Sequence, residues 1–278
     1  MAEVWRRIAD GVHVRRHASL DLNVGLVLGR DRCLVIDTRC TAEQARELTA
    51  AVRTVTPLPW TVVNTHAHYD HCFGNHTFRP APIWGHRRCA KDLSEMGAVQ
   101  RDGTARMIAA TGDAAFAAAL AATVIDPPDH LVDGEATLDL GGRTVNLRFL
   151  GRGHTDHDLV VEVPDSDLVF AGDLVEEGGA PSFDDAYPLD WPATARRLES
   201  LARGPVVPGH GAVVDRAFVA AQATEFERLA VVARAAHMTG TAIDAAARGT
   251  PPFGPDIASI ALRRAGWQLD GEPSPAAS

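Results

Sequence analysis

Four side chains that can bind a transition metal lie within six residues of this chain, in the motif H-A-H-Y-D-H at residues 66–71. Imidazole and carboxylate are the usual protein ligands of zinc and its first-row neighbours. In an extended segment, residues i and i+2 point the same way, so His66 and His68 can hold one ion. A turn directly afterwards would send Asp70 and His71 to a second ion. The spacing predicts a two-metal site; the alternative is an accidental group of surface histidines.

Three further segments place a ligand-type residue beside glycine, each after a strand-like run. They are His154 after Val145–Leu150, Asp173 after Leu168–Ala171, and His210 after Val206–Pro208. Glycine lets the backbone turn sharply and approach a ligand closely, as a site built from loops requires. Each segment alone is weak evidence, because Gly-His-Gly is commonly a plain turn. Their recurrence along the chain favours one shared site.

The ordered set resembles the pattern of the metallo-β-lactamase superfamily, which is H-x-H-x-D-H followed by a His, an Asp and a His. The resemblance covers roughly residues 10–215 in layout. It implies an α/β (α+β) fold: a four-layer αββα sandwich of two mixed β-sheets with helices on both outer faces. The active site would lie at one edge, between the sheets.

The resemblance also assigns a role to each ligand. The first ion takes His66, His68 and His154, the second takes Asp70, His71 and His210, and Asp173 bridges the two, as in the glyoxalase-II-like and lactonase-like branches. Asp37 matches a strand-end aspartate that hydrogen-bonds behind the metal loop in relatives. Capping of the helix that opens at Thr41 is the alternative role for Asp37.

This ligand set implies metal-assisted hydrolysis. Two dications about 3.5–4 Å apart share a hydroxide, because coordination lowers the pKa of water from 15.7 toward about 7. The hydroxide would attack the carbonyl of a small ester, thioester, lactone or lactam, with Asp70 and Asp173 as the catalytic carboxylates. Two Zn²⁺ ions per chain are expected, and iron or manganese also suits these ligands.

Four residues are candidates for contacts behind the ligands or in the substrate pocket: Asp37, Thr155, His157 and Tyr187. For His157, a surface position at the start of a strand is favoured over such a contact. For Tyr187, the alternative is plain structural packing.

Two other functions stay open. A sulfur dioxygenase of the same superfamily keeps the same seven residues, but binds one iron and oxidises a glutathione persulfide. A non-catalytic protein that uses the metal structurally is less favoured, because structural zinc sites are normally closed tetrahedra of Cys and His. Two branches depart from this chain: the secreted zinc β-lactamases of the cysteine group have Cys in place of Asp173, and the diiron flavoproteins have Glu in place of His68.

The elements that must position these residues can be read from apolar patterning. Strands are predicted at 4–8, 12–16, 24–28, 33–37, 60–64, 82–85, 136–140, 144–150, 159–163, 168–171 and 206–207. Helices are predicted from 41 until prolines 57 and 59, from 87 to about 124 with breaks near 102–103 and 111–112, at 192–203, at 215–237, and in shorter pieces out to 267. A capping box of Thr41 and Gln44 opens the first helix.

Length and composition fit a soluble enzyme of 278 residues with a net charge of −9. One metallo-β-lactamase-like domain over residues 1–278 is expected, with a core at about 10–215, a C-terminal helical segment at about 215–268 and a disordered tail at about 270–278. The scattered basic residues disfavour nucleic acid, and the resemblance implies a small-molecule substrate.

The four cysteines include no C-x-x-C pair, which indicates reduced thiols in a cytoplasmic protein. The first residues lack the continuous apolar stretch that is typical of a signal peptide. The sequence has no apolar run of 18 residues, so it predicts no membrane-spanning helix. A homodimer is compatible with these features.

Overall fold

The structure is a computed structural model that describes residues 4–249 and 253–271. The predicted disordered tail lies, from residue 272 on, outside the described residues. The chain divides into two compact units. The first contains the described residues up to 149 together with 159–166, and the second contains 150–158 and the described residues from 167 on.

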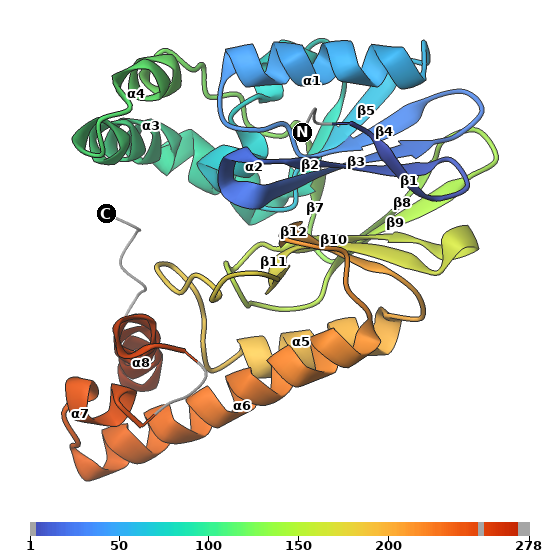
Figure 1. The fold of residues 1–278 in the computed structure, drawn as a ribbon. Helices are drawn as coiled ribbons and strands as arrows, with labels where there is room; N and C mark the ends of the chain where they lie inside the picture. Colours follow the sequence, from blue (N-terminus) through green and yellow to red (C-terminus); the bar gives the residue numbers. More distant parts are fainter. Residues whose placement is uncertain (1–3, 250–252, 272–278) are drawn as a thin grey trace. The chain divides into compact units, whose positions relative to one another are not determined.

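A mixed β-sheet forms the centre of the first unit, and its strands pair in the order β7-β6-β5-β4-β3-β2-β1 (Figure 1). The strands are β1 (Arg6–Ala9), β2 (Val12–His17), β3 (Leu22–Leu28), β4 (Cys33–Ile36), β5 (Trp60–Val63), β6 (Ile83–His86) and β7 (His130–Val132). Strands β4 to β7 are parallel to one another. The pairs β1–β2, β2–β3 and β3–β4 are antiparallel. The carboxyl ends of β4 and β5 therefore meet at one edge of the sheet. The sequence did not predict β7.

Helix α1 (Ala42–Val55) covers one face of this sheet (Figure 1). The predicted cap is confirmed, because the Thr41 side chain accepts a hydrogen bond from the Gln44 N–H at 3.3 Å. The buried stripe of α1 packs against apolar residues of β3, β4 and β5: Ala45, Leu48 and Val52 contact a core that includes Leu22, Val24, Leu26, Val35 and Val62. Burial of this stripe, rather than helix propensity alone, holds α1 in place.

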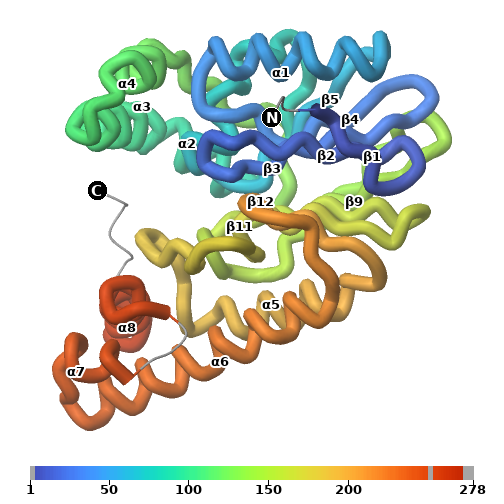
Figure 2. Tube along the Cα trace, viewed as in Figure 1, coloured from blue at the N-terminus to red at the C-terminus, as the bar shows by residue number. Residues whose placement is uncertain are grey.

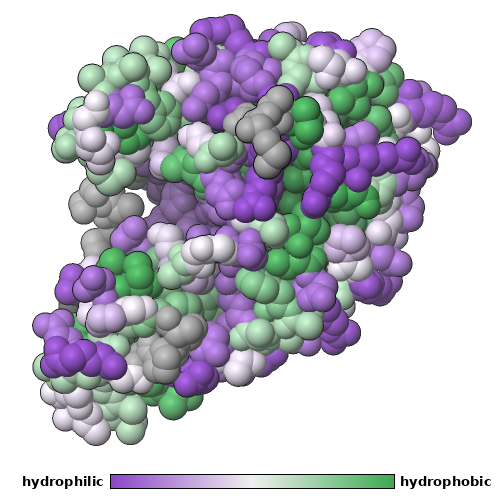
Figure 3. Space-filling view, viewed as in Figure 1, coloured by the Kyte–Doolittle hydropathy of each residue, from purple (hydrophilic) through white to green (hydrophobic). Residues whose placement is uncertain are grey.

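Two helices that pack on each other follow β6, namely α3 (Arg87–Ala110) and α4 (Ala114–Ala121). The predicted break at 102–103 is wrong, since α3 runs through Gly103. A helix-interior glycine costs only about 1 kcal/mol, which burial of Leu93 and Ala105 against Leu120 of α4 outweighs. The predicted break at 111–112 is confirmed. Figure 3 shows mostly pale green, mildly hydrophobic surface over the alanine-rich α4.

The remaining elements of the first unit are short. An antiparallel meander is made of β8 (Glu135–Asp139), β9 (Thr144–Phe149) and β10 (Leu159–Val163). Gly141 and Gly142 form the predicted hairpin turn at φ of +88° and +81°. Four single turns of helix complete the list, and only at the first of them did the sequence predict a turn: α2 (Tyr69–Cys72), η1 (Ser19–Asp21), η2 (Asn75–Phe78) and η3 (Pro164–Ser166).

The second unit pairs two parallel strands, β11 (Leu168–Glu176) and β12 (Val206–His210), which are connected through α5 (Trp191–Leu201). Helix α6 (Arg216–Thr239) packs along α5, and α7 (Ile243–Ala247) and α8 (Pro255–Asp270) follow (Figure 2). Strand β11 extends five residues beyond its predicted end. The predicted end was wrong because Gly172, at φ +54°, shifts the register of the strand without ending it. Pairing with β12 continues to Glu176.

Within the described ranges, none of the helices combines the length and hydrophobicity that a bilayer crossing needs. All four cysteines are buried and unbridged, as expected for reduced thiols.

Candidate metal centre

The H-A-H-Y-D-H motif lies at the carboxyl end of β5, and Asp37 directly follows the neighbouring parallel strand β4. Carboxyl ends of parallel strands are where open α/β sheets place ligands, because the loops there leave the sheet together. His68 is extended and precedes the single turn α2. The turn predicted from the spacing is therefore present, and it separates Asp70 and His71 from the two histidines before them.

His66 and His68 approach each other as a pair. His66 Nε2 lies 3.1 Å from His68 Nδ1, and the ring centroids are 4.6 Å apart. The His66 ring is completely buried. Gln100 of α3 fixes the backbone between them, because its side-chain amide donates to the Ala67 carbonyl at 3.2 Å.

Asp70 and His71 form a second pair within the same unit. His71 Nε2 lies 3.6 Å from Asp70 Oδ2. The other ring nitrogen of His71, Nδ1, lies 2.8 Å from Asp37 Oδ2. An ionised carboxylate accepts, so His71 carries its proton on Nδ1 and its lone pair on Nε2, facing Asp70.

Asp37 also controls His66 through one intervening residue. The Thr65 hydroxyl and the Thr65 N–H each donate to Asp37 at 2.8 Å, and His66 Nδ1 lies 3.0 Å from the same hydroxyl oxygen. Because the hydroxyl proton is directed to Asp37, His66 Nδ1 donates to that oxygen and Nε2 keeps the lone pair. Asp37 thus sets the tautomer of two candidate ligands. Asp37 does not have its alternative role as the cap of α1, because the Thr41 side chain caps that helix.

A further network behind the loop was not predicted from the sequence. The Asn64 and Asn75 side chains exchange hydrogen bonds at 2.8 and 3.0 Å, and the Thr38 hydroxyl donates to Asn75 at 2.9 Å. The Thr38 N–H donates to the His71 carbonyl at 2.7 Å. Asparagine and threonine are common in ordinary turns, so their types and spacing did not predict this hydrogen-bond network.

The second unit holds the other three candidate ligands. Asp173 Oδ2 lies 3.6 Å from His154 Nε2 and 3.3 Å from His210 Nε2. His154 and Asp173 are buried, while His210 is partly exposed. His154 follows β9 in a loop, as predicted. Asp173 lies inside β11 and His210 is the last residue of β12, so both lie within strands rather than after them. One carboxylate oxygen between two imidazoles is the arrangement that a bridging ligand needs.

Gly209 permits this arrangement. A Cβ placed on Gly209 would lie 1.7 Å from Asp173 Oδ1, far inside van der Waals contact. The parallel strands β11 and β12 can therefore bring Asp173 and His210 together only if residue 209 has no side chain.

Thr155 and His157 stiffen the loop that carries His154. The Thr155 hydroxyl and N–H donate to Asp158 at 2.7 and 2.8 Å, and His157 Nδ1 lies 2.8 Å from Asp156 Oδ1. Burial raises the pKa of Asp158, although the neighbouring histidines lower it. The surface alternative for His157 is wrong, because its side chain is buried ahead of β10. Tyr187 donates its N–H to the Gly153 carbonyl at 2.8 Å and so joins the same loop.

Cys72 is not a ligand in this arrangement. Its thiol is buried and donates to the His68 carbonyl at 3.1 Å. Burial, together with the negative charges nearby, raises the pKa of the Cys72 thiol well above its usual value. A neutral thiol of this kind is a core side chain.

The separations between donor atoms test whether a metal fits. In a tetrahedral site with bonds of about 2.0–2.1 Å, neighbouring donor atoms lie about 3.3 Å apart. The pairs within each unit lie 3.1, 3.6, 3.6 and 3.3 Å apart. Imidazole and carboxylate are also the ligands that zinc and its neighbours prefer. The residues present therefore fit metal ligation.

Residues 20–210 match the family model of the metallo-beta-lactamase superfamily. The chain belongs to this superfamily. The resemblance stated from the motif is confirmed, and so is the metallo-hydrolase class that it implied.

Known relatives agree with this assignment. The "Probable metallo-hydrolase YqgX" of Bacillus subtilis is 24% identical over 178 residues, which cover 63% of this chain and 72% of the relative. The "Metallo-beta-lactamase type 2" of Bacteroides fragilis is 30% identical over 89 residues, or 30% of this chain and 36% of that protein. The TMB-1 structure has a TM-score of 0.64 at 19% identity, covering 82% of this chain and 98% of its own. A metallo-beta-lactamase from Pontibacter korlensis has a TM-score of 0.61 at 21% identity, covering 81% and 99%. These likenesses show the mixed α/β fold.

Proposed function

We propose that the chain is a dinuclear metal-dependent hydrolase whose two ions are held by the seven candidate ligands: His66, His68 and His154 on one ion, Asp70, His71 and His210 on the other, and Asp173 on both. The donor separations of 3.1–3.6 Å within each unit carry the proposal. Membership of the superfamily supports the proposal that the ligands of the two units belong to one dinuclear site. Two Zn²⁺ ions are the proposed occupants.

Bound metal supplies a water of lowered pKa as nucleophile, and positive charge that polarises the scissile carbonyl. The protein supplies orientation and proton handling. Asp70 is buried, with its carboxylate beside His71, and is placed to hold the attacking water and pass a proton to the leaving group. Asp173 keeps His154 and His210 in register, and Asp37 holds His66 and His71 in the tautomers that present Nε2.

The proposed substrate is a small ester, thioester, lactone or lactam. Asp173 stands where the cysteine-group β-lactamases have a cysteine, which favours the first three over a lactam. A four-layer αββα sandwich in one domain is the proposed architecture. It is supported by β4, whose four residues are all buried, as in strands covered on both faces. A cytoplasmic location is proposed from the four unbridged cysteines.

Metal analysis combined with a substrate panel tests the function. We expect about two zinc ions per chain in purified protein, and turnover of at least one member of a panel of ester, thioester, lactone, β-lactam and phosphodiester reporters. One iron per chain with oxygen consumption on a glutathione persulfide would replace the proposal by the dioxygenase alternative. Unfolding on chelation without turnover of any reporter would favour a structural metal.

Two ligand variants test the assignment. His68→Ala and Asp70→Ala should remain folded and lose at least about 100-fold in activity, as expected for loss of a metal-binding group. His76→Ala is the matched control, because His76 is an exposed histidine close to the motif whose side chain lies against the Asp126 carboxylate rather than among the candidate ligands. Full turnover by the ligand variants, at unchanged metal content, would refute the assignment.

A further inference from the structure

Helix α6 is the longest helix described in the second unit, and both of its ends are well defined. The Asp215 side chain caps the N-terminus by accepting from the Phe218 N–H at 3.0 Å, and Gly240, at φ +64°, ends the helix. Its 24 residues form a rod of about 36 Å. Helices α5 and α8 pack on the same side of this rod (Figure 2). They cover its buried stripe: Val219, Ala223, Phe226, Leu229, Ala230 and Ala233.

The opposite side of α6, which we call the outer face, is largely apolar. A helix face turned to solvent normally carries many charged and polar residues. Here Val231 is 68% exposed and Met238 is 82% exposed. Single exposed apolar side chains are common, but a continuous strip of them is typical of an interaction surface. The outer face consists of exposed or partly exposed residues at helical spacing: Ala217, Ala221, Thr224, Glu225, Arg228, Val231, Val232, Ala235 and Met238.

One ion pair interrupts the apolar outer face, close to the midpoint of the helix. Arg228 Nη1 donates to the two carboxylate oxygens of Glu225 at 3.0 and 3.2 Å. The Thr224 hydroxyl donates to the Ala220 carbonyl at 2.9 Å, so it adds no unmet donor. An acid beside a base at the centre of a face is self-complementary. A two-fold axis through that centre brings Glu225 of one copy beside Arg228 of the other.

The sizes of the apolar side chains favour the same arrangement. The N-terminal half of the outer face is small, with Ala217 and Ala221, whereas the C-terminal half has the larger Val231, Val232 and Met238. In an antiparallel pair of identical helices, each small half lies opposite a large half, and Ala221 lies near Val232 of the other copy. A parallel pair would set the large residues against each other and leave a gap between the alanines.

We propose that the outer face of α6 binds a second copy of this chain as an antiparallel helix pair with two-fold symmetry. The charge pair and the size gradient both match an identical partner, and neither needs a different protein. Interfaces that bury less than about 1,200 Å² are typically weak, and one helix from each protomer makes a small interface. We therefore expect a dimer that dissociates on dilution. This inference is independent of the proposed hydrolase function.

Sedimentation velocity over a range of protein concentrations tests for the dimer. Between about 1 and 500 µM, the span in which weak interfaces dissociate, the sedimenting mass should rise from one chain to two. A single chain at every concentration would overturn the proposal. A chain that stays monomeric but cosediments with vesicles of phosphatidylcholine and phosphatidylglycerol would assign the outer face to a bilayer instead.

Two charge reversals test whether the centres of the two outer faces meet. Glu225→Arg and Arg228→Glu each place like charges together in a homodimer, so each should weaken self-association at least about tenfold. An equimolar mixture of the two variants should dimerise again, because each helix then carries the charges that the other lacks. Failure of the mixture to dimerise, although the wild type does, would refute this interface.

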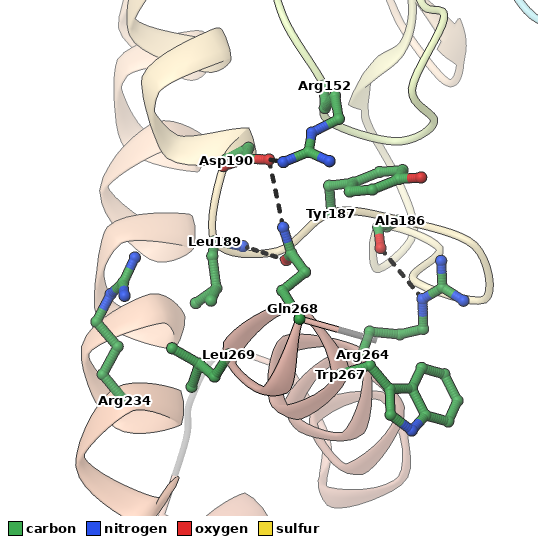
Figure 4. A pocket seen from close by; sticks show the side chains of 11 residues that line it. Arg152, Ala186, Tyr187, Leu189, Asp190, Arg234, Arg264, Trp267, Gln268 and Leu269 are labelled. Atoms are coloured by element: carbon green, nitrogen blue, oxygen red, sulfur yellow. Dashed lines mark hydrogen bonds and ion pairs between the residues drawn. The ribbon is translucent and has the colours of Figure 1, made fainter. Parts of the chain in front are cut away.

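Arg234→Glu is the matched control for the charge reversals. It changes the net charge by the same amount as Arg228→Glu and lies on the same helix. Arg234 lies on another flank of α6, which lines a cavity together with Leu189 and Leu269 (Figure 4). This variant should dimerise like the wild type. Equal loss of association in Arg234→Glu and Arg228→Glu would indicate an effect of net charge alone, and unchanged association in Arg228→Glu would place the interface elsewhere. Either result overturns the proposal.

Cysteine cross-linking tests the antiparallel direction. On mild oxidation with diamide, Ala221→Cys mixed with Val232→Cys should give a disulfide-linked dimer, whereas Ala221→Cys alone should not. The two copies of residue 221 lie about eleven residues apart along an antiparallel pair, or about 16 Å, which is beyond disulfide reach. The native cysteines are buried, so they do not compete for the cross-link. A dimer of Ala221→Cys linked to itself would show a parallel pair and refute the arrangement.

Discussion

At the residue scale, one buried carboxylate controls much of the proposed centre. Asp37 accepts from Thr65 and from His71 Nδ1, and it acts on His66 through the Thr65 hydroxyl. The sequence singled out the candidate ligands because their spacing is rare. It could not predict that Thr65 transmits the effect of Asp37, because a threonine before a histidine is unremarkable in any loop.

The variant Asp37→Asn tests this control. The substitution would place an amide nitrogen where a carboxylate oxygen now accepts hydrogen bonds, so metal affinity should fall about 10–100-fold. Backbone strain does not confound the result, because residue 37 has φ +66° and asparagine tolerates that region well. Competition with a chromophoric chelator measures the affinity. Asp10→Asn, in an exposed turn, should leave it unchanged; equal affinities for both variants would refute the role of Asp37.

At the element scale, the close contact of β11 and β12 places Asp173 beside His210. The apolar runs predicted both strands, but the extent of β11 could not be predicted, because pairing with β12 carries it past Gly172. The sequence singled out the Gly-His-Gly segment as a candidate. The requirement for glycine at position 209 is steric, and it becomes visible only when the two strands are placed side by side.

Gly209→Ala should therefore damage the metal centre. The new methyl group must displace Asp173, which we expect to cost about 1–3 kcal/mol of unfolding free energy, as in other overpacked cores, and to reduce bound metal. Gly266→Ala is the matched control, because a Cβ there meets nothing within 4 Å and alanine favours the helix. Urea unfolding and metal analysis measure both effects. A Gly209→Ala protein as stable as the control, with full metal content, would contradict this account.

At the scale of the whole molecule, membership of the superfamily was predictable because the motif order is specific, and of the predicted fold the structural neighbours confirm the mixed α/β class. The packing of α8 on α6 was not predictable, because the sequence indicated only shorter helical pieces out to residue 267.

Metal removal should lower the stability of the whole chain. A ligand present at 100 times its dissociation constant stabilises the folded state by about 2.7 kcal/mol, so chelation should lower Tm by about 5 °C or more. Differential scanning fluorimetry with and without chelator measures the shift, and returning zinc should restore it. His68→Ala should show a smaller shift. An unchanged Tm in the wild type would argue against tightly bound metal.

The four cysteines have a practical consequence. All are buried, and burial raises the pKa of Cys33 to about 11, although Arg53 lowers it, and holds those of Cys40 and Cys72 above their usual range. Maleimide dyes react with accessible thiolates, so the native chain offers them little. A cysteine introduced at Val231, an exposed position on α6, would therefore carry a single fluorophore without removing any native residue first.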